Sequence, residues 1–168
     1  SLECGKIRFN YSAEEIVQIC QHILMTTAHT CQPGVEGRLE CAVDSYMLTT
    51  DVHRLSQILI NLLTNANKFT EQGRITLSFE VLEKEGMVRF AVADTGCGIP
   101  KEKQASIFQR FEKLDENAQG SGLGLSICQL IIEHIGGKIW IDPDYTGGSR
   151  FVFTHPIHQT RNNSKKED

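Results

Sequence analysis

Apolar residues recur every three or four positions along residues 50–69, which is the spacing of one face of a helix. The members of this stripe are Leu55, Ile58, Leu59, Leu62, Leu63 and Ala66. A stripe of this width is typical of an amphipathic helix that packs against a sheet. On an adjacent face, Asn61, Asn65 and Lys68 stand at i, i+4 and i+7. Taken alone, this polar face is more typical of an ordinary solvent-exposed surface than of a binding site.

Two further stretches, residues 13–29 and 121–135, have the same helical spacing. Ser12 and Glu15 form the pattern of a capping box at the start of the first. A pair of glycines that begins at Gly136 is typical of the end of a helix and follows the second. The sequence therefore predicts three main helices, and one or two short helical turns lie within residues 101–111.

Strands are predicted where apolar and polar residues alternate. These segments are residues 6–10, 38–43, 74–82, 88–93, 138–142 and 148–155. The third and fourth are joined by a short turn, which favours an antiparallel hairpin. The order of helices and strands predicts an α/β fold, a two-layer sandwich with a mixed, mostly antiparallel sheet of about five strands. About three helices should cover one face of this sheet.

The composition is that of an ordinary globular domain, with 168 residues, 40% hydrophobic and 23% charged. Residues 1–158 fit one domain with one core, whereas residues 159–168 form a polar, charged tail that we expect to be disordered. No apolar run approaches the roughly 20 residues that span a bilayer, and no signal-peptide pattern opens the chain. We therefore expect a cytoplasmic domain that does not insert directly into a membrane.

Charge and cysteine usage exclude some other classes of function. A net charge of -4 provides no broad basic surface for nucleic acid. The six cysteines are widely spaced, without a CxxC pair or a histidine spaced to complete a zinc site. We expect reduced thiols that are mostly buried.

A glycine-rich segment, GSGLGL at residues 120–125, lies where a polar loop enters a predicted helix. Glycines at such a place let backbone amides approach phosphate oxygens, and the helix N-terminus adds partial positive charge. No Lys-Ser/Thr pair follows, as it would in a P-loop, and no strand leads directly into the segment as in a dinucleotide-binding fold. The segment could be an ordinary loop. A phosphate site here needs a cation from elsewhere, for which Lys68 is the candidate.

Asp94 ends a predicted buried strand and begins the segment DTGCGIP at residues 94–100. Its glycines would let a flat ligand approach the backbone, and a buried carboxylate needs a donor such as the exocyclic amine of adenine. The alternative is an Asp-Gly turn that satisfies its own side chain. Phe108 and Phe111 are interpreted as anchors for the core or for a lid rather than as residues that stack on a ligand.

These segments, in this order and at these intervals, resemble the ATP-binding catalytic domain of bacterial sensor histidine kinases. The segments are Asn61, Asn65 and Lys68 on a helix, DTGCGIP at 94–100, FQRF at 108–111 and GSGLGL at 120–125. That family belongs to the Bergerat-fold group, with gyrase, mismatch-repair ATPases and heat-shock chaperones. The resemblance extends over residues 2–156 and implies the Bergerat fold.

The resemblance also implies roles for individual residues. Asn65 would bind Mg²⁺, Asn61 would belong to its surroundings, and Lys68 would contact the phosphates of ATP; these three form the expected catalytic group. Asp94 would bind adenine. The other residues expected at the nucleotide are Phe69, Gly96, Gly98, Ile99, Phe108, Lys113, Gly120, Gly122, Leu123, Gly124 and Leu125. Residues 147–149 (GGS) are interpreted as a structural turn.

Asn61 stands where the hydrolytic relatives have a glutamate, and an amide cannot accept the proton of an attacking water. The sequence therefore favours presentation of the γ-phosphoryl group of ATP over rapid hydrolysis. None of the six histidines has the acidic and Arg-Thr-Pro context of the family's phosphoacceptor. The acceptor is thus expected on the dimerisation and phosphoacceptor helices of the same parent chain.

A response-regulator receiver domain is the other expected partner, and the isolated domain should be monomeric. Two alternatives stay open. The chain could be a nucleotide-gated binding module without phosphotransfer, or an ATPase or protein kinase from elsewhere in the superfamily.

Overall fold

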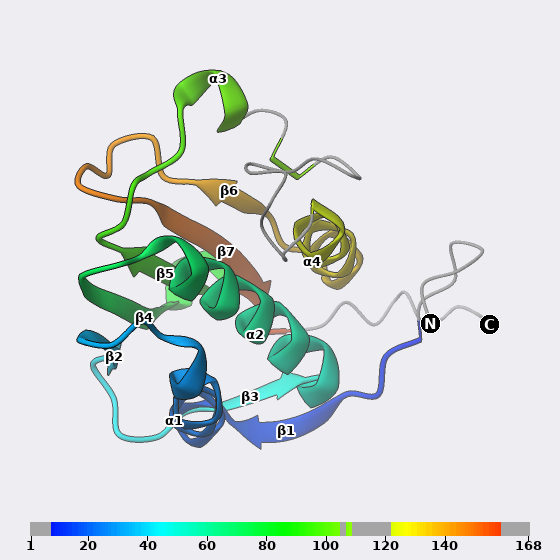
Figure 1. The fold of residues 1–168 in the computed structure, drawn as a ribbon. Helices are drawn as coiled ribbons and strands as arrows, with labels where there is room; N and C mark the ends of the chain where they lie inside the picture. Colours follow the sequence, from blue (N-terminus) through cyan, green and yellow to red (C-terminus); the bar gives the residue numbers. More distant parts are fainter. Residues whose placement is uncertain (1–7, 105–106, 109–121, 159–168) are drawn as a thin grey trace.

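The computed structural model describes residues 8–104, 107–108 and 122–158 (Figure 1). A mixed five-stranded sheet of order β2-β4-β5-β7-β6 forms one layer. Its strands are β2 (Val35–Glu40), β4 (Gly73–Leu82), β5 (Met87–Asp94), β6 (Ile139–Ile141) and β7 (Arg150–Pro156). Three helices, α1 (Ile16–Thr27), α2 (Val52–Phe69) and α4 (Gly122–Ile135), lie on one face of the sheet (Figure 1). The predicted two-layer α/β sandwich is confirmed.

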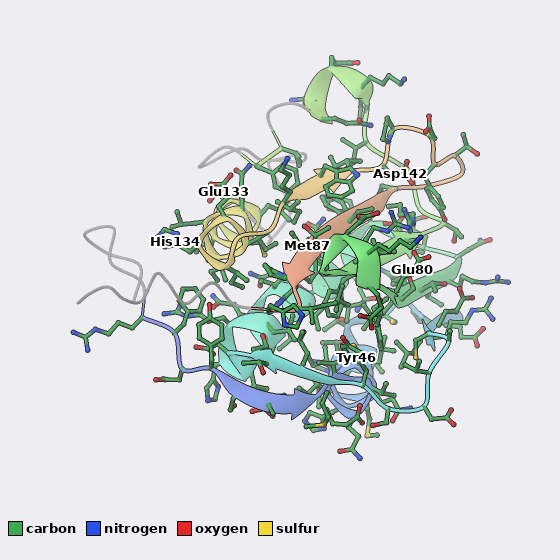
Figure 2. The ribbon with its side chains drawn as sticks, turned by 180° about the vertical axis from the view of Figure 1, so that it is seen from behind. Tyr46, Glu80, Met87, Glu133, His134 and Asp142 are labelled. Atoms are coloured by element: carbon green, nitrogen blue, oxygen red, sulfur yellow. The ribbon has the colours of Figure 1, made fainter. Side chains whose placement is uncertain are left out.

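The core lies between the apolar stripe of α2 and the inward side chains of the central strands. All six residues of the stripe are at most 5% exposed. The hairpin of β4 and β5 is antiparallel, as predicted, and places Phe79 opposite Phe90. Phe90 in turn lies opposite Phe153 of β7, and the two rings stack with their centroids 4.8 Å apart. In the view from behind, Glu80 and Met87 lie on the side of the sheet away from the helices (Figure 2).

The N-terminal predictions are wrong in two respects. Residues 8–11 have no regular structure, and the strand is instead β1 (Ser12–Glu15), which pairs antiparallel with β3 (Met47–Thr50). Because this pairing extends through Glu15, α1 begins only at Ile16, and Ser12 lies too far before the helix to cap it. The N-cap is Glu15, whose carboxylate accepts hydrogen bonds from the amides of the first helical turn.

Helix α2 begins two residues later than predicted, because β3 takes up the preceding residues. Asp51 is its N-cap: the carboxylate accepts from His53 N at 3.0 Å and Arg54 N at 3.1 Å. Directly before it, the hydroxyl of Thr50 lies 2.8 Å from Nε2 of the fully buried His155 on β7. Helix α2 is therefore attached to the sheet at its first turn.

The tautomer of His155 follows from its two partners. Its Nδ1 lies 2.8 Å from the carbonyl oxygen of Pro156, which can only accept. Nδ1 therefore carries the proton, and Nε2 accepts from the hydroxyl of Thr50. Burial lowers the pKa of His155, so the neutral ring is favoured.

Most of the other boundaries agree with the predictions within two residues. The exceptions are α1, which begins three residues later than predicted, β2, which begins and ends three residues earlier, and the segment after residue 100. There the described helical turn is α3 (Lys101–Gln104). Gly136 ends α4 with a φ of +104°, and the amides of Gly136 and Gly137 both donate to the carbonyl of Ile132, as expected of a glycine C-cap.

The described part of the chain contains no helix that is long and apolar enough to cross a bilayer. Its five cysteines are free thiols, of which two are buried, two are half-buried and Cys97 is exposed. Because only two of these five thiols are buried, the prediction of mostly buried thiols is wrong for the described residues. The tail at residues 159–168 lies outside the described residues.

Candidate nucleotide-binding site

Two close contacts with α2 define the candidate site. Gly96, just after β5, packs on the C-terminal end of the helix: a Cβ atom there would lie 2.3 Å from the carbonyl oxygen of Phe69. Only glycine allows this approach. Near the middle of α2, Asn61 Nδ2 donates to the carbonyl oxygen of Gly124 in the first turn of α4 at 3.4 Å. Asn65 lies one helical turn from Asn61 and one turn from Phe69, so its position is between these two contacts.

Asp94 has a buried carboxylate, with the residue only 4% exposed. Its Oδ1 accepts from Gly96 N at 2.9 Å and from Ser149 N at 3.2 Å. Its Oδ2 accepts from the hydroxyl of Ser149 at 3.1 Å. Since each carboxylate oxygen has about two acceptor positions, Oδ1 is filled and Oδ2 retains one. The turn bond to Gly96 that the alternative interpretation requires is present, and the carboxylate still has room for one further donor.

The loop after β5 also packs tightly on the turn between β6 and β7. A Cβ atom at Gly148 would lie 1.9 Å from the carbonyl oxygen of Asp94, and one at Gly98 would lie 3.3 Å from the carbonyl oxygen of Gly148. A groove of about 560 Å³ runs between this loop and the turn. Of the expected nucleotide residues, Gly96, Gly98 and Ile99 line it, whereas the polar residues of α2 do not.

The polar side chains of α2 differ in their partners. Within the described ranges, the amide of Asn65 and the ammonium of Lys68 have no hydrogen-bond or ion-pair partner, and both residues are half-buried. Asn61 instead uses its amide nitrogen to contact α4, at Gly124 and at Cys128 Sγ, 3.6 Å away. Among the described residues, Asn65 and Lys68 are thus the polar side chains of this face of α2 that no protein group engages.

These groups fit a metal ion with attached phosphates. An amide oxygen suits a hard cation, and an ammonium suits a phosphate oxygen. Across the described residues there is no group of three or more His, Cys, Asp or Glu side chains that could hold a metal. A metal here would need to be of the kind that keeps few protein ligands and relies on phosphates and water, as Mg²⁺ does.

Four other expected residues lie nearby but differ in what they contact. Phe69 is half-buried at the end of α2, and Ile99 is half-buried with its carbonyl accepting from Gln104 Nε2 at 3.0 Å. Phe108 packs edge-on against Phe151 with ring centroids 6.0 Å apart, as its interpretation as an anchor requires. Leu125 is 5% exposed and belongs to the core.

The remaining expected residues belong to the glycine-rich segment and the stretch before it. Gly122 is the first residue of α4 and Gly124 lies in its first turn. Phe111, Lys113 and Gly120 lie outside the described residues, as does the side chain of Leu123. Their predicted roles stay predictions.

Two residues of the turn between β6 and β7 were missed as site residues. Ser149, interpreted from the sequence as part of a structural turn, donates both its amide and its hydroxyl to the Asp94 carboxylate. The hydroxyl of Tyr145 donates to the backbone carbonyl of Asp94 at 3.1 Å. One signal was available in the sequence for Ser149, which is a polar residue directly before an apolar strand. In the structure this residue is only 9% exposed.

Residues 50–159 match the family of histidine kinase-, DNA gyrase B- and HSP90-like ATPases. The chain belongs to this family. The match covers α2, the loop after β5 and the turn that holds Asp94, which together make up the site described above. Membership in this ATPase family makes the chain an ATP-binding domain and confirms the expected Bergerat-type fold.

The curated relatives include sensory kinases of cyanobacteria. The adaptive-response sensory kinase SasA of Nostoc is 43% identical over 154 residues, which are 86% of this chain and 37% of that protein. SasA of Prochlorococcus marinus is 40% identical over 172 residues, which are 97% of this chain and 45% of that protein. The chain thus spans less than half the length of these relatives.

Solved histidine kinases have the same fold. Full-length ShkA in complex with AMPPNP is 30% identical, with a TM-score of 0.82, over 92% of this chain and 32% of that chain. The nucleotide-free catalytic domain of the histidine kinase ThkA is 29% identical, with a TM-score of 0.76, over 89% of this chain and 97% of that chain. The similarity to an isolated catalytic domain over nearly its full length confirms that the chain corresponds to the ATP-binding catalytic domain of sensor histidine kinases.

Proposed function

We propose that this domain binds Mg²⁺-ATP and presents the γ-phosphoryl group to a histidine on a separate phosphoacceptor domain. The observation that carries the proposal is the difference in bonding within one site. The buried carboxylate of Asp94 has a single acceptor position left, while Asn65 and Lys68 on the adjacent helix have no partner within the described ranges. A ligand with one amine donor and a metal-bound phosphate chain satisfies all three groups.

At the base end, Oδ2 of Asp94 accepts the exocyclic amine of adenine. A buried carboxylate is a strong acceptor, and it would repel a base that presents a carbonyl oxygen at the same place. Gly96 and Gly98 keep side chains out of the loop beneath the base, and Phe69 and Ile99 provide apolar surface beside it.

At the phosphate end, the amide oxygen of Asn65 is the proposed ligand of Mg²⁺, and the ammonium of Lys68 contacts the phosphates. The metal supplies neutralisation of the charge that develops on the phosphates during transfer. Asn61 holds the N-terminal turn of α4, which carries the glycine-rich segment. Because an amide is not a base, Asn61 does not activate water, and this favours transfer to another acceptor over hydrolysis.

The proposed partners are the phosphoacceptor helices that carry the histidine and the receiver domain of a response regulator. The relatives support this. The curated ones are named as sensory kinases, and one solved structure is of ThkA in complex with the response regulator TrrA, 28% identical with a TM-score of 0.75 over 94% of this chain and 45% of that chain. These partners would lie in parts of the relatives that this chain does not span, or in separate proteins.

The test combines calorimetry with phosphotransfer. We expect Mg²⁺-ATP to bind more tightly than GTP, and the γ-phosphate of labelled ATP to reach a histidine only when a phosphoacceptor domain is added. Phosphohistidine on this domain by itself would contradict the proposal. ATP binding without transfer would indicate a nucleotide-gated module, and appreciable steady-state hydrolysis would indicate an ATPase.

A further inference from the structure

The turn between β6 and β7 holds the backbone of Asp94 as well as its carboxylate. The Asp94 amide donates to the carbonyl oxygen of Ser149 at 2.9 Å, and the Asp94 carbonyl accepts from the hydroxyl of Tyr145 at 3.1 Å. Asp94 is the last residue of β5, so its carbonyl lies where the regular pairing with β7 ends. The tyrosine hydroxyl gives this carbonyl the hydrogen bond that a backbone amide of the neighbouring strand would provide within the sheet.

The turn that carries Tyr145 is itself fixed to β7. Arg150 Nη1 lies 2.9 Å from Asp142 Oδ2, and the amide of Asp142 donates to the carbonyl oxygen of Arg150 at 2.8 Å. The amide of Asp144 also donates to the Asp142 carboxylate, at 3.0 Å. Tyr145 therefore projects from a turn with little freedom of its own.

The position of the Asp94 backbone decides where its carboxylate points. The turn packs so closely on the Asp94 carbonyl at Gly148 that no side chain fits there. A Cβ atom at Gly148 would lie 1.9 Å from the Asp94 carbonyl oxygen. The hydroxyl of Tyr145 holds that carbonyl in place at the edge of the groove of about 560 Å³, which Tyr145 also lines. Without the hydroxyl, water in the groove would donate the hydrogen bond to the Asp94 carbonyl instead. The loop after Asp94 would then be less restricted in its conformation.

We infer that Tyr145 is a positioning residue for recognition of the nucleotide base. It does not touch the base; it acts through Asp94, by keeping the open acceptor position of Oδ2 aimed at the exocyclic amine. The inference rests on the proposed binding of adenine by Asp94 and names the group that orients that carboxylate.

The substitution Tyr145→Phe tests this, because it removes the hydroxyl and keeps the ring. We expect the affinity for ATP to fall by about fivefold to tenfold, the usual effect of one hydrogen bond. Inosine triphosphate has a carbonyl oxygen in place of the amine, and its affinity should change by less than about twofold, since Asp94 gives it no hydrogen bond. The ratio of the two affinities, measured by calorimetry, should therefore fall. The control is Tyr11→Phe, whose ring stacks on Phe9 away from the site.

The outcomes separate the inference from the proposed function. A wild-type protein that binds both nucleotides equally would overturn the adenine role of Asp94 and, with it, the role of Tyr145. A wild-type preference for ATP that survives Tyr145→Phe unchanged would overturn the role of Tyr145 alone. An equal loss for both nucleotides, together with a lower unfolding temperature, would assign Tyr145 a purely structural role and would also overturn the inference.

Discussion

The two ends of the proposed nucleotide site are built in different ways. At the base end, the Asp94 carboxylate accepts three hydrogen bonds from the protein, and the residue is held on both sides of its backbone. At the phosphate end, Asn65 and Lys68 lie on a helix whose apolar face is fully packed, yet their own polar groups have no partner within the described ranges. One end is organised before a ligand arrives, and the other is left for the ligand to complete.

This difference agrees with the chemistry of each part of the ligand. A base is recognised by one or two hydrogen bonds, so their direction must be set in advance. Phosphates and a hydrated metal carry high charge, and their attraction to a protein group depends less on direction than a hydrogen bond does. A flexible lysine ammonium can adjust its position to reach them. We expect substitutions at the base end to change which nucleotide binds, and those at the phosphate end to change how binding depends on metal and salt.

The largest effect is expected at the base end. Asp94→Asn replaces the acceptor with an amide that also faces the donors of Gly96 and Ser149. The affinity for ATP should fall by about 3 kcal/mol, on the order of 100-fold, because a buried hydrogen bond to a charged group is lost. Asp144→Asn, in the exposed turn, is the matched control and should leave binding unchanged. Unaltered calorimetric affinities for ATP and GTP in Asp94→Asn would refute the base assignment.

The next effect separates metal binding from nucleotide binding. Asn65→Ala should weaken Mg²⁺-ATP by about 2 kcal/mol, roughly 30-fold, and metal-free ATP much less, since a metal ligand is removed. Asn67, two residues along, is the control: it is 3% exposed, and its amide contacts Thr27, Thr30 and Cys31. Asn67→Ala should lower the unfolding temperature and leave the metal dependence intact. Equal losses with and without Mg²⁺ in Asn65→Ala would disprove the metal role.

A smaller effect is expected for Lys68→Met, which keeps the aliphatic chain and removes the charge. The affinity for ATP should fall by about 1 kcal/mol, roughly fivefold, and should depend less on salt than in the wild type. Titrations at low and high ionic strength measure this. Lys84→Met, in the short 3-10 helix Glu83–Glu85, should keep the wild-type salt dependence. A salt dependence that is unchanged in Lys68→Met would place the lysine away from the phosphates.

The smallest effect on nucleotide binding is expected from the buried histidine, remote from either end. The native pKa of His155 is lowered by burial, so below about pH 6.5 the unfolded chain takes up a proton that the native chain does not. Stability should fall as the pH drops below that value, by at most about 1.4 kcal/mol per pH unit. His155→Gln should flatten this dependence, and His134→Gln should not. Equal slopes of unfolding free energy against pH in wild type and His155→Gln would contradict the assignment of this pH dependence to His155.

The main elements could be predicted from the sequence because their patterns are local. The stripe of α2 repeats over about three helical turns, and the hairpin of β4 and β5 alternates over its whole length. The short β1 and β3 could not be predicted in this way. The four residues of β1, SAEE, contain no apolar alternation, and their extended form depends on pairing with residues more than 30 positions away.

The candidate site likewise contains some residues that could be predicted from local sequence patterns and others that could not. Asn65, Lys68 and Asp94 belong to recognisable segments, and the fold brings those segments into contact through Gly96 and Gly124. Ser149 and Tyr145 were missed because their role lies in bonds to Asp94, which is more than 50 residues away in the chain. A turn of small and polar residues gives no indication of what it holds until the tertiary structure is known.

Helix α2 also sets the spacing between the two contacts that border the proposed site. Its contacts with α4 and with the loop after β5 are made by Asn61 and Phe69, eight residues apart. With a rise of about 1.5 Å per residue, these contacts are separated by about 12 Å along the helix axis. Under the proposed function, the phosphate chain is the part of the ligand that extends toward the Asn61 contact, so a nucleoside alone would leave the glycine-rich turn of α4 without a ligand.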